Sequence, residues 1–491
     1  MKKALIIGAG IGGIATSIRL ATKGYQVSVF EKNDYPGGKL SAFTLGAFRF
    51  DAGPSLFTMP HFVTELFSLA GEDAGSFFKY KKKDIHCEYF WEDGTRLTAY
   101  ADRKRFCDTV EAQLNVPAQR VHRYLDKAQK KYDLTAPLFL ERSLHKIDTY
   151  LNKETRKAIL GLGQLELFKS LHRVNKEQLQ NPYLVQFFDR FATYNGSDPY
   201  QTSGIMSLVQ HLEEHYGTFI PRQGMGAISE SLVALAKRKG VCFHMNQKVD
   251  RIVVNNRKIE GIEVNGQLVK ADVVVSNMDV VPTYRHLMPL QKQPKRTLEQ
   301  ERSSSALIFY WGIEKVFPQL NLHNIFFSKD YKQEFKDIFR NKTLSDDPTV
   351  YVNISSKDVA SDAPPGCENW FVMINAPADT GQDWDLLVAK TRNQVLQKVS
   401  RILGEDIAPL IVEETHLSPP LIAEKTASFR GALYGSSSNN RMSAFLRHPN
   451  FSRSIENLFF CGGSVHPGGG IPLCLLSAKI TAQMIPDAHD E

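Results

Sequence analysis

The chain of 491 residues lacks several features that would assign it to other protein classes. Its six cysteines are scattered and form no C-x-x-C pair, which excludes an obvious zinc or dithiol motif and fits a reducing compartment. No apolar run of about 18 residues occurs, so no transmembrane helix is predicted. The apolar start of the chain is short and rich in glycine, and no cleavage site follows a basic region, so a signal peptide is not expected.

Internal repeats and low-complexity tracts are also absent, whereas 42% of the residues are apolar and can build a large core. The net charge is only +7, from 60 basic and 53 acidic residues. A modest basic excess is common in soluble proteins and also fits adhesion to an anionic membrane surface. We therefore expect a cytoplasmic protein of two or three domains that associates peripherally with a membrane and does not bind nucleic acid.

A strand, a glycine turn, a helix and a second strand are predicted at the start of the chain. Residues 4–7 are apolar, Gly8–Gly13 form the turn, and a helix is expected from about Ile14 to Lys23. The second strand, at 26–31, is rich in β-branched residues. A G-x-G-x-x-G pattern in this position is typical of dinucleotide-binding folds, because glycines let the backbone and the helix N-terminus approach a pyrophosphate.

Glu31 ends the second strand, where a carboxylate can accept hydrogen bonds from ribose hydroxyl groups. The same charge would repel the 2′-phosphate of NADP. NAD and FAD therefore remain as candidate dinucleotides.

The middle of the chain alternates between segments with helical patterns and segments with strand patterns. Helical, lysine-rich and aromatic segments dominate from about residue 89 to 216, and strand patterns return near 241. Further strand-like segments lie at 305–313, 323–328, 350–354 and 370–374. The strand segments near 1–50, 241–278 and 457–461 suggest one sheet that is assembled from distant parts of the chain.

Three parts of the sequence, two pairs of segments and one single segment, resemble the amine-oxidase and phytoene-desaturase superfamily of flavoproteins. They are EKNDYPGGKLSAF with FRFDAGPSLF, KVDRIVVNNRKIEGIEV with ADVVVSN, and FFCGGSVHPGGGIPLCLLSAKI. The resemblance implies FAD as the cofactor, with contacts to its pyrophosphate, adenine and isoalloxazine. Together with the glycine pattern, it gives the expected FAD-binding residues Gly8, Gly10, Ile11, Gly12, Gly13, Glu31, Lys32, Gly38, Lys39, Gly53, Pro54, Ser55, Val249, Ser276, Asn277, Gly462, Gly463, Gly470, Ile471 and Pro472.

Within the superfamily, HPGGGIP and the segment 195–236 are similar to carotenoid desaturases. GSVHPG followed by PLCLLSAK is closer to the hydroxycarotenoid 3,4-desaturases, in particular the γ-carotenoid desaturase type of marine flavobacteria, than to phytoene desaturases. This resemblance implies a C-3,4 double bond introduced into an acyclic, 1-hydroxylated carotenoid end group by hydride transfer to flavin N5 and loss of a proton. It also implies quinone or oxygen as electron acceptor.

His466 is the candidate catalytic residue, because a histidine titrates near neutrality, although it could instead shape its loop. His211 and His215 are four residues apart and could ligate a metal, but no third ligand is evident and no metal site is predicted. The segment 159–174 could be a core helix or an interfacial helix that touches lipid.

Three other functions are compatible with parts of the sequence. A phytoene-type desaturase and a flavin amine oxidase share the superfamily, but an amine oxidase usually has an aromatic pair near the flavin, and none is identifiable. A prenyl-protein escort of the GDP-dissociation-inhibitor type shares the fold without flavin chemistry. The intact EKNDYPGGK and GGSVHPGGGIP segments argue against the escort.

The expected fold is α/β, with a Rossmann-type FAD-binding domain, an inserted α+β substrate domain and a helical, membrane-facing part. The FAD-binding domain is expected in three pieces, at 1–88, 216–283 and 421–491. The helical, membrane-facing substrate insertion is expected at 89–215, and the substrate domain at 284–420.

Overall fold

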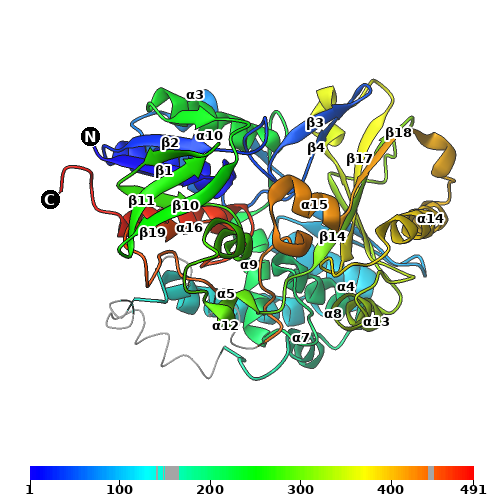
Figure 1. Cartoon of the computed structure of the whole chain (residues 1–491). Helices are drawn as coiled ribbons and strands as arrows, with labels where there is room; N and C mark the ends of the chain where they lie inside the picture. Colours follow the sequence, from blue (N-terminus) through cyan, green and yellow to red (C-terminus); the bar gives the residue numbers. More distant parts are fainter. Residues whose placement is uncertain (140–141, 147–148, 150–164, 441–446, 491) are drawn as a thin grey trace.

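The computed structural model describes residues 1–139, 142–146, 149, 165–440 and 447–490 (Figure 1). Two sheets dominate it, with a layer of helices below them in the view of Figure 1. Within these residues, no helix combines the length and apolar character that crossing a membrane would require.

A five-stranded parallel sheet combines strands from both ends and the middle of the chain. Its order is β19 (Leu458–Phe460), β13 (Val273–Ser276), β1 (Lys3–Ile7), β2 (Gln26–Phe30) and β9 (Cys242–His244). The prediction that distant segments share one sheet is confirmed by these five strands. Parallel strands covered on both faces are continuous apolar runs, and the buried residues of β1 and β13 follow this rule.

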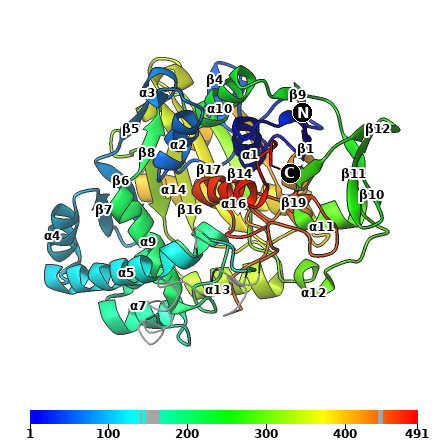
Figure 2. The same ribbon diagram turned by 90° about the vertical axis from the view of Figure 1, so that its left-hand side faces the viewer.

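Helices cover one face of the parallel sheet and a β-meander covers the other. The helices are α1 (Ile11–Thr22), α2 (His61–Leu69), α10 (Gly226–Arg238) and α16 (Ile471–Met484). The meander consists of β10 (Val249–Asn255), β11 (Lys258–Val264) and β12 (Gln267–Lys270). Figure 2 shows α1, α2 and α16 close together, with the meander on the opposite side of the sheet. Helix α1 begins at Ile11 rather than at about Ile14, because Gly10 is its N-cap.

A second, seven-stranded sheet forms one wall of the molecule. Its order is β18 (Ile411–Leu417), β14 (Ser305–Ile313), β17 (Glu368–Ala376), β16 (Val350–Ile354), β15 (His323–Phe326), β6 (Ile85–Phe90) and β7 (Arg96–Tyr100). The four strands expected between 305 and 374 are confirmed as β14 to β17. Strand β6 contains the expected domain boundary at residue 88, so the first piece of the chain contributes to both sheets. The domain boundaries themselves stay a prediction.

Helices pack below the second sheet through aromatic and aliphatic side chains. They are α4 (Arg103–Leu114), α5 (Ala118–Phe139), α7 (Leu171–Leu179), α8 (Pro182–Asp189), α9 (Val209–His211) and the short turns η3 (Arg190–Asn195), η4 (Gly204–Leu208) and η5 (Leu212–Tyr216). The expectation of one helix over 159–174 is wrong for the part that the structure describes, because residues 165–170 form turns and α7 begins only at Leu171. Residues 159–164 of that segment lie outside the described residues.

Shorter elements connect these layers. The two-stranded pairs are β3 (Ala42–Leu45) with β4 (Phe48–Asp51) and β5 (Tyr80–Lys82) with β8 (Phe219–Pro221). Further helices are α3 (Ala74–Phe77), α11 (Val280–Pro282), α12 (Lys295–Leu298), α13 (Tyr331–Lys336), α14 (Trp384–Leu403) and α15 (Pro419–Thr426).

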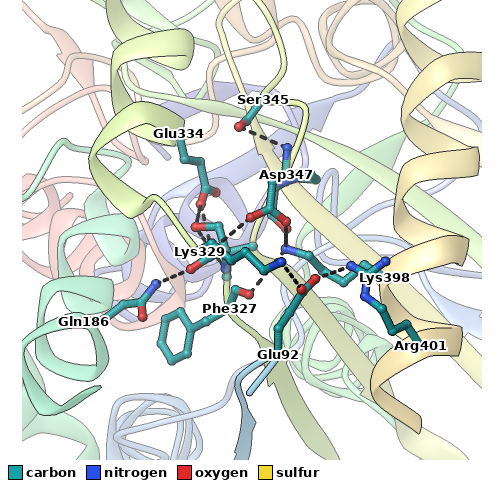
Figure 3. A network of polar contacts seen from close by, with 12 residues as sticks. Glu92, Gln186, Phe327, Lys329, Glu334, Ser345, Asp347, Lys398 and Arg401 are labelled. Carbon is teal, nitrogen blue, oxygen red and sulfur yellow. Dashed lines mark hydrogen bonds and ion pairs between the residues drawn. The ribbon is translucent and has the colours of Figure 1, made fainter. Parts of the chain in front are cut away.

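A polar network fastens α14 to the outer face of the seven-stranded sheet (Figure 3). The buried Nζ of Lys398 donates to the carbonyl oxygens of Pro348 at 2.6 Å and Phe327 at 3.3 Å, and it forms an ion pair with Asp347. Glu92 accepts from two further cations beside it. The chain thus supplies its own partners for the buried ammonium group, as a purely structural site requires.

Candidate functional site

A cavity of about 890 Å³ extends from the carboxyl edge of the parallel sheet to the seven-stranded sheet and the helices. This volume lies near the upper end of the range for ligand sites. Two parts of its wall differ in character. We call the part lined by Gly8, Gly10, Gly12, Gly462 and Gly463 the glycine half, and the part lined by His86, Arg190, Glu213, His323 and Tyr351 the side-chain half.

Three segments meet in the glycine half at distances that only glycine permits. A Cβ on Gly13 would lie 2.2 Å from the carbonyl oxygen of Gly8, and one on Gly12 would lie 3.2 Å from the Cα of Gly462. A Cβ on Gly10 would lie 2.7 Å from Oδ1 of Asn277. The N-terminus of α1 therefore faces the cavity without side chains in the way, and its free N–H groups and positive dipole end favour an anionic group.

Glu31 is fixed beside this turn by two backbone groups. Its Oε2 accepts from the N–H of Ala9 at 2.8 Å, and its Oε1 accepts from the N–H of Asn33 at 3.0 Å. Each carboxylate oxygen has a further lone pair, and the side chain lines the cavity. Glu31 can therefore accept hydrogen bonds from two hydroxyl groups of a ribose.

Two cations lie along the same wall, the half-buried Lys39 and the buried Arg447. Nζ of Lys39 donates to the carbonyl oxygen of Leu433 at 3.0 Å, and burial lowers the pKa of Lys39. Arg447 donates to the carbonyl oxygen of Tyr434 at 2.7 Å, and burial lowers its pKa to about 10, so its guanidinium group stays charged at neutral pH. Positive charge that the chain only partly compensates fits a cofactor with two phosphate groups.

The last strand, turn and helix close the glycine half. Ser477 accepts from the N–H of Gly462 at 3.1 Å, which holds the turn against α16. Gly470 is the N-cap of α16 with a φ of 104°, a conformation that favours glycine, and nothing lies within 4 Å of where its Cβ would be. Gly470, Ile471 and Pro472 line the cavity, so a second helix N-terminus can stabilise negative charge on a bound ring system.

The residues present therefore fit FAD. All residues expected to bind FAD line the cavity except Gly13 and Ser276. Gly13 lies against the carbonyl group of Gly8, and the Ser276 hydroxyl shares a hydrogen bond of 2.9 Å with Thr283. Their direct contact with FAD, like that of the lining residues, stays a prediction.

His466 lies behind the cavity wall rather than in it. It is only 1% exposed, it is not among the described residues that line the cavity, and its Nε2 donates to the carbonyl oxygen of Arg142 at 2.7 Å. Burial lowers its pKa to about 4, so the ring stays neutral at physiological pH. These contacts are those of a histidine that shapes its loop, and its catalytic role stays a prediction.

His211 and His215 stack with ring centroids 4.8 Å apart. Among the described residues, no group of three His, Cys, Asp or Glu side chains is placed to hold a metal ion.

The side-chain half contains a buried ion pair that the sequence did not reveal. Arg190 donates to the hydroxyl oxygens of Tyr89 at 2.6 Å and Tyr194 at 3.0 Å, and its Nη2 lies 3.7 Å from Oε2 of Glu213. The hydroxyl of Tyr194 in turn donates to Glu213 at 2.6 Å. Both charges are thus paired and hydrogen-bonded, as burial demands.

A chain of hydrogen bonds links the same half to the glycine half. The hydroxyl groups of Ser55 and Tyr351 are 2.8 Å apart, and Nδ1 of His323 lies 2.7 Å from the Tyr351 hydroxyl. Only Ser55 belongs to a segment that the sequence singled out. No local pattern marks His323 or Tyr351, because they lie on different strands of the second sheet.

Comparison with known proteins identifies the family. The family model described as flavin containing amine oxidoreductase matches residues 11–486. The chain is 54% identical over 489 residues to a 1-hydroxycarotenoid 3,4-desaturase of Flavobacterium sp. (strain P99-3), and 100% of each chain is covered. It is 30% identical over 488 residues to a 4,4′-diaponeurosporene oxygenase of Staphylococcus aureus (strain MSSA476), with 99% of this chain and 98% of that protein covered.

Solved structures show the same fold. A putrescine oxidase matches with a TM-score of 0.65 at 14% identity and covers 98% of each chain. A RAB GDI of Plasmodium falciparum matches with a TM-score of 0.56 at 14% identity and covers 98% of this chain and 97% of that one. The expected α/β fold of the amine oxidase and phytoene desaturase type is confirmed. The chain belongs to the flavin-containing amine oxidoreductase family and is an FAD-dependent oxidoreductase.

Proposed function

We propose that the protein is an FAD-dependent carotenoid desaturase that introduces a C-3,4 double bond into an acyclic, 1-hydroxylated end group. The observation that carries this proposal is the identity of 54%, over the full length of both chains, with a 1-hydroxycarotenoid 3,4-desaturase. The size and composition of the cavity support it, because a polyene needs a long apolar site beside the flavin.

The cavity continues from the glycine half along aliphatic side chains. Leu144, Ile205, Leu208, Val209 and Leu212 line it on the helical side. A conjugated hydrocarbon chain gains free energy from burial against such a wall, at about 25 cal/mol per Å² of apolar surface. The same wall excludes water from the reacting carbons, so the chain positions the allylic C–H bond and keeps the site dry.

When bound, FAD would supply the acceptor for the hydride that leaves one carbon of the C-3,4 bond, while the other carbon loses a proton. The chain's own contribution is to hold and tune it. Gly10 and Glu31 would hold its pyrophosphate and ribose, and the N-terminus of α16 would favour a negatively charged ring.

We also propose that the enzyme works at a membrane surface and passes electrons to a quinone or to oxygen. A carotenoid resides in lipid, and the chain has a basic excess of seven charges. Flotation with anionic liposomes should show binding that weakens as salt rises. No binding at low salt would contradict the membrane proposal.

Pigment analysis tests the proposed reaction. Cells that make a 1-hydroxylated acyclic carotenoid should accumulate, on co-expression of this protein, a pigment with one more conjugated double bond. Cells that make only phytoene should give little change. Equal or better conversion of phytoene would overturn the C-3,4 assignment and leave the assignment as a flavin-dependent desaturase intact.

A further inference from the structure

Two buried histidines of the side-chain half each present a nitrogen that the protein does not satisfy. His86 is 5% exposed and His323 is 3% exposed, and both line the cavity. In the described part of the chain, neither Nε2 has a hydrogen-bond partner. An unpaired buried polar atom is costly, so two of them on one cavity wall indicate a ligand that completes them.

The hydrogen bonds of His323 determine which nitrogen carries its proton. Nδ2 of Asn353 donates to the carbonyl oxygen of Leu322 at 3.0 Å, which fixes the orientation of the amide. The same Nδ2 lies 3.2 Å from Nδ1 of His323, so this ring nitrogen accepts. The hydroxyl of Tyr351, at 2.7 Å, donates to it as well and can accept from Ser55. The proton of the neutral ring is therefore on Nε2, so this residue of the cavity wall has an N–H donor without a partner among the described residues.

His86 complements this donor. A β-bulge between Ile85 and Cys87 places His86 as the extra residue of β6, and a bulge re-aims the side chain it contains. Nδ1 of His86 lies 2.9 Å from the hydroxyl oxygen of Thr218. When Nδ1 donates to Thr218, Nε2 of His86 is left as an acceptor.

Both rings are uncharged under physiological conditions. Burial lowers the pKa of His323 to about 3 and lowers the pKa of His86 below its ordinary value. Neighbouring cations, among them Lys83 and Arg190, act in the same direction on His323. With His86 in the tautomer whose Nδ1 donates to Thr218, one imidazole donor and one imidazole acceptor match a single hydroxyl group, which accepts one hydrogen bond and donates another.

We propose that His323 and His86 bind the 1-hydroxyl group of the carotenoid, with Nε2–H of His323 donating to its oxygen and Nε2 of His86 accepting its hydrogen. The inference rests on the proposed function and names the residues that select its substrate. The C-3 carbon is two bonds from the hydroxyl-bearing carbon. On the protein side, hydrogen bonds connect His323 through Tyr351 to Ser55, which belongs to the segment expected beside the flavin. Holding the hydroxyl here therefore holds the C-3,4 bond near the site of hydride transfer.

The test compares substrate preference among purified holoenzymes. His323→Leu and His86→Leu remove the two ring nitrogens, His323→Gln restores an amide donor, and His416→Leu makes the same change at an exposed position of β18. FAD content and thermal midpoint show that each variant is folded. The kcat/KM is measured for a 1-hydroxylated acyclic carotenoid and for its non-hydroxylated counterpart. Dissociation constants for both are measured with the reduced holoenzyme, which binds without turnover.

His323→Leu should lower the preference for the hydroxylated substrate by roughly 10- to 100-fold, which is the range expected when a buried hydroxyl loses its partner. His86→Leu should act in the same direction, His323→Gln should recover part of the loss, and His416→Leu should have no effect. The dissociation constants should change in parallel with kcat/KM.

An unchanged preference in both leucine variants that retain FAD would overturn the inference, and so would an equal loss for both substrates. A wild-type enzyme that desaturates both carotenoids without preference would do the same. Tyr331 also lines the cavity, and its buried hydroxyl has no partner among the described residues. A loss of preference in Tyr331→Phe, with none in the two leucine variants, would place the carotenoid hydroxyl there and would also overturn the inference. A wild-type enzyme that desaturates neither carotenoid would instead contradict the proposed function.

Discussion

The glycine half of the cavity presents backbone atoms, whereas the side-chain half presents imidazole, guanidinium, carboxylate and phenol groups. The first is built from short contiguous turns next to β1, β13 and β19, where glycines bring three segments together. The second is built from single side chains on β6, β15 and β16 and on the helices. The difference fits our two proposals, in which the first half binds the cofactor and the second half selects the substrate.

Gly10→Val should abolish FAD binding in the glycine half. The added side chain collides with Asn277, whose Oδ1 would lie 2.7 Å from the new Cβ, and it fills the space in front of the α1 N-terminus. The purified variant should contain no FAD by absorbance. Gly75→Val is the matched control, because Gly75 is exposed and its Cβ would make only ordinary contacts with Asp73. Undiminished FAD in Gly10→Val would refute the placement of the pyrophosphate.

Arg190→Met should damage the side-chain half and leave FAD in place. Removal of the guanidinium group leaves Glu213 buried without its ion-pair partner, which typically costs about 3–5 kcal/mol. Denaturant unfolding of the holoenzyme measures this loss. The double variant Arg190→Met with Glu213→Leu should lose clearly less, because no charge is left unpaired. A double variant as unstable as the sum of the two single ones would contradict this explanation.

Acid should lower the free energy of unfolding, in part because His323 becomes protonated when the protein unfolds. Its pKa is about 3 in the folded protein and 6.5 ordinarily, so the unfolded state binds the proton first and the free energy of unfolding falls as pH decreases from 6.5. Between pH 6.5 and pH 4, His323 should account for roughly 3 kcal/mol of that loss. His323→Leu should therefore lose less stability over this window. Parallel curves for the two proteins would contradict the lowered pKa.

Lys398→Met tests a polar site outside the cavity. The variant loses two hydrogen bonds to carbonyl oxygens and the ion pair with Asp347, which should cost about 1–3 kcal/mol. FAD content and substrate preference should stay unchanged, since the chain itself satisfies this ammonium group. A changed substrate preference would contradict the assignment of Lys398 to a purely structural site.

The glycine half could be predicted because its signals are local. The turn Gly8–Gly13, Glu31 at the end of β2 and the glycines after β19 each stand in a short pattern with a physical reason. The strands β14 to β17 were predictable for the same reason, because the alternation of apolar and polar residues and the β-branched side chains that indicate a strand lie within a few consecutive residues. Helix α1 begins at Ile11, about three residues before the start expected from the sequence, because its N-cap is a glycine without a capping side chain.

The side-chain half could not be predicted, because its residues meet only through the second sheet. His86 and His323 lie on adjacent strands that pair in parallel, and that pairing depends on long-range topology. The orientation of His86 also depends on a bulge that leaves no mark in the sequence. His466 shows the opposite effect, since its position in a cofactor motif suggested chemistry, whereas its ring points to Arg142 behind the wall.

Anaerobic mixing of the holoenzyme with a 1-hydroxylated acyclic carotenoid measures the proposed reaction most directly. The oxidised-flavin absorbance should disappear, and each reduced flavin should correspond to one new conjugated double bond at C-3,4. The non-hydroxylated counterpart should reduce the flavin far more slowly. A flavin that stays oxidised, or a product that forms only in air and carries new oxygen, would contradict desaturation by hydride transfer.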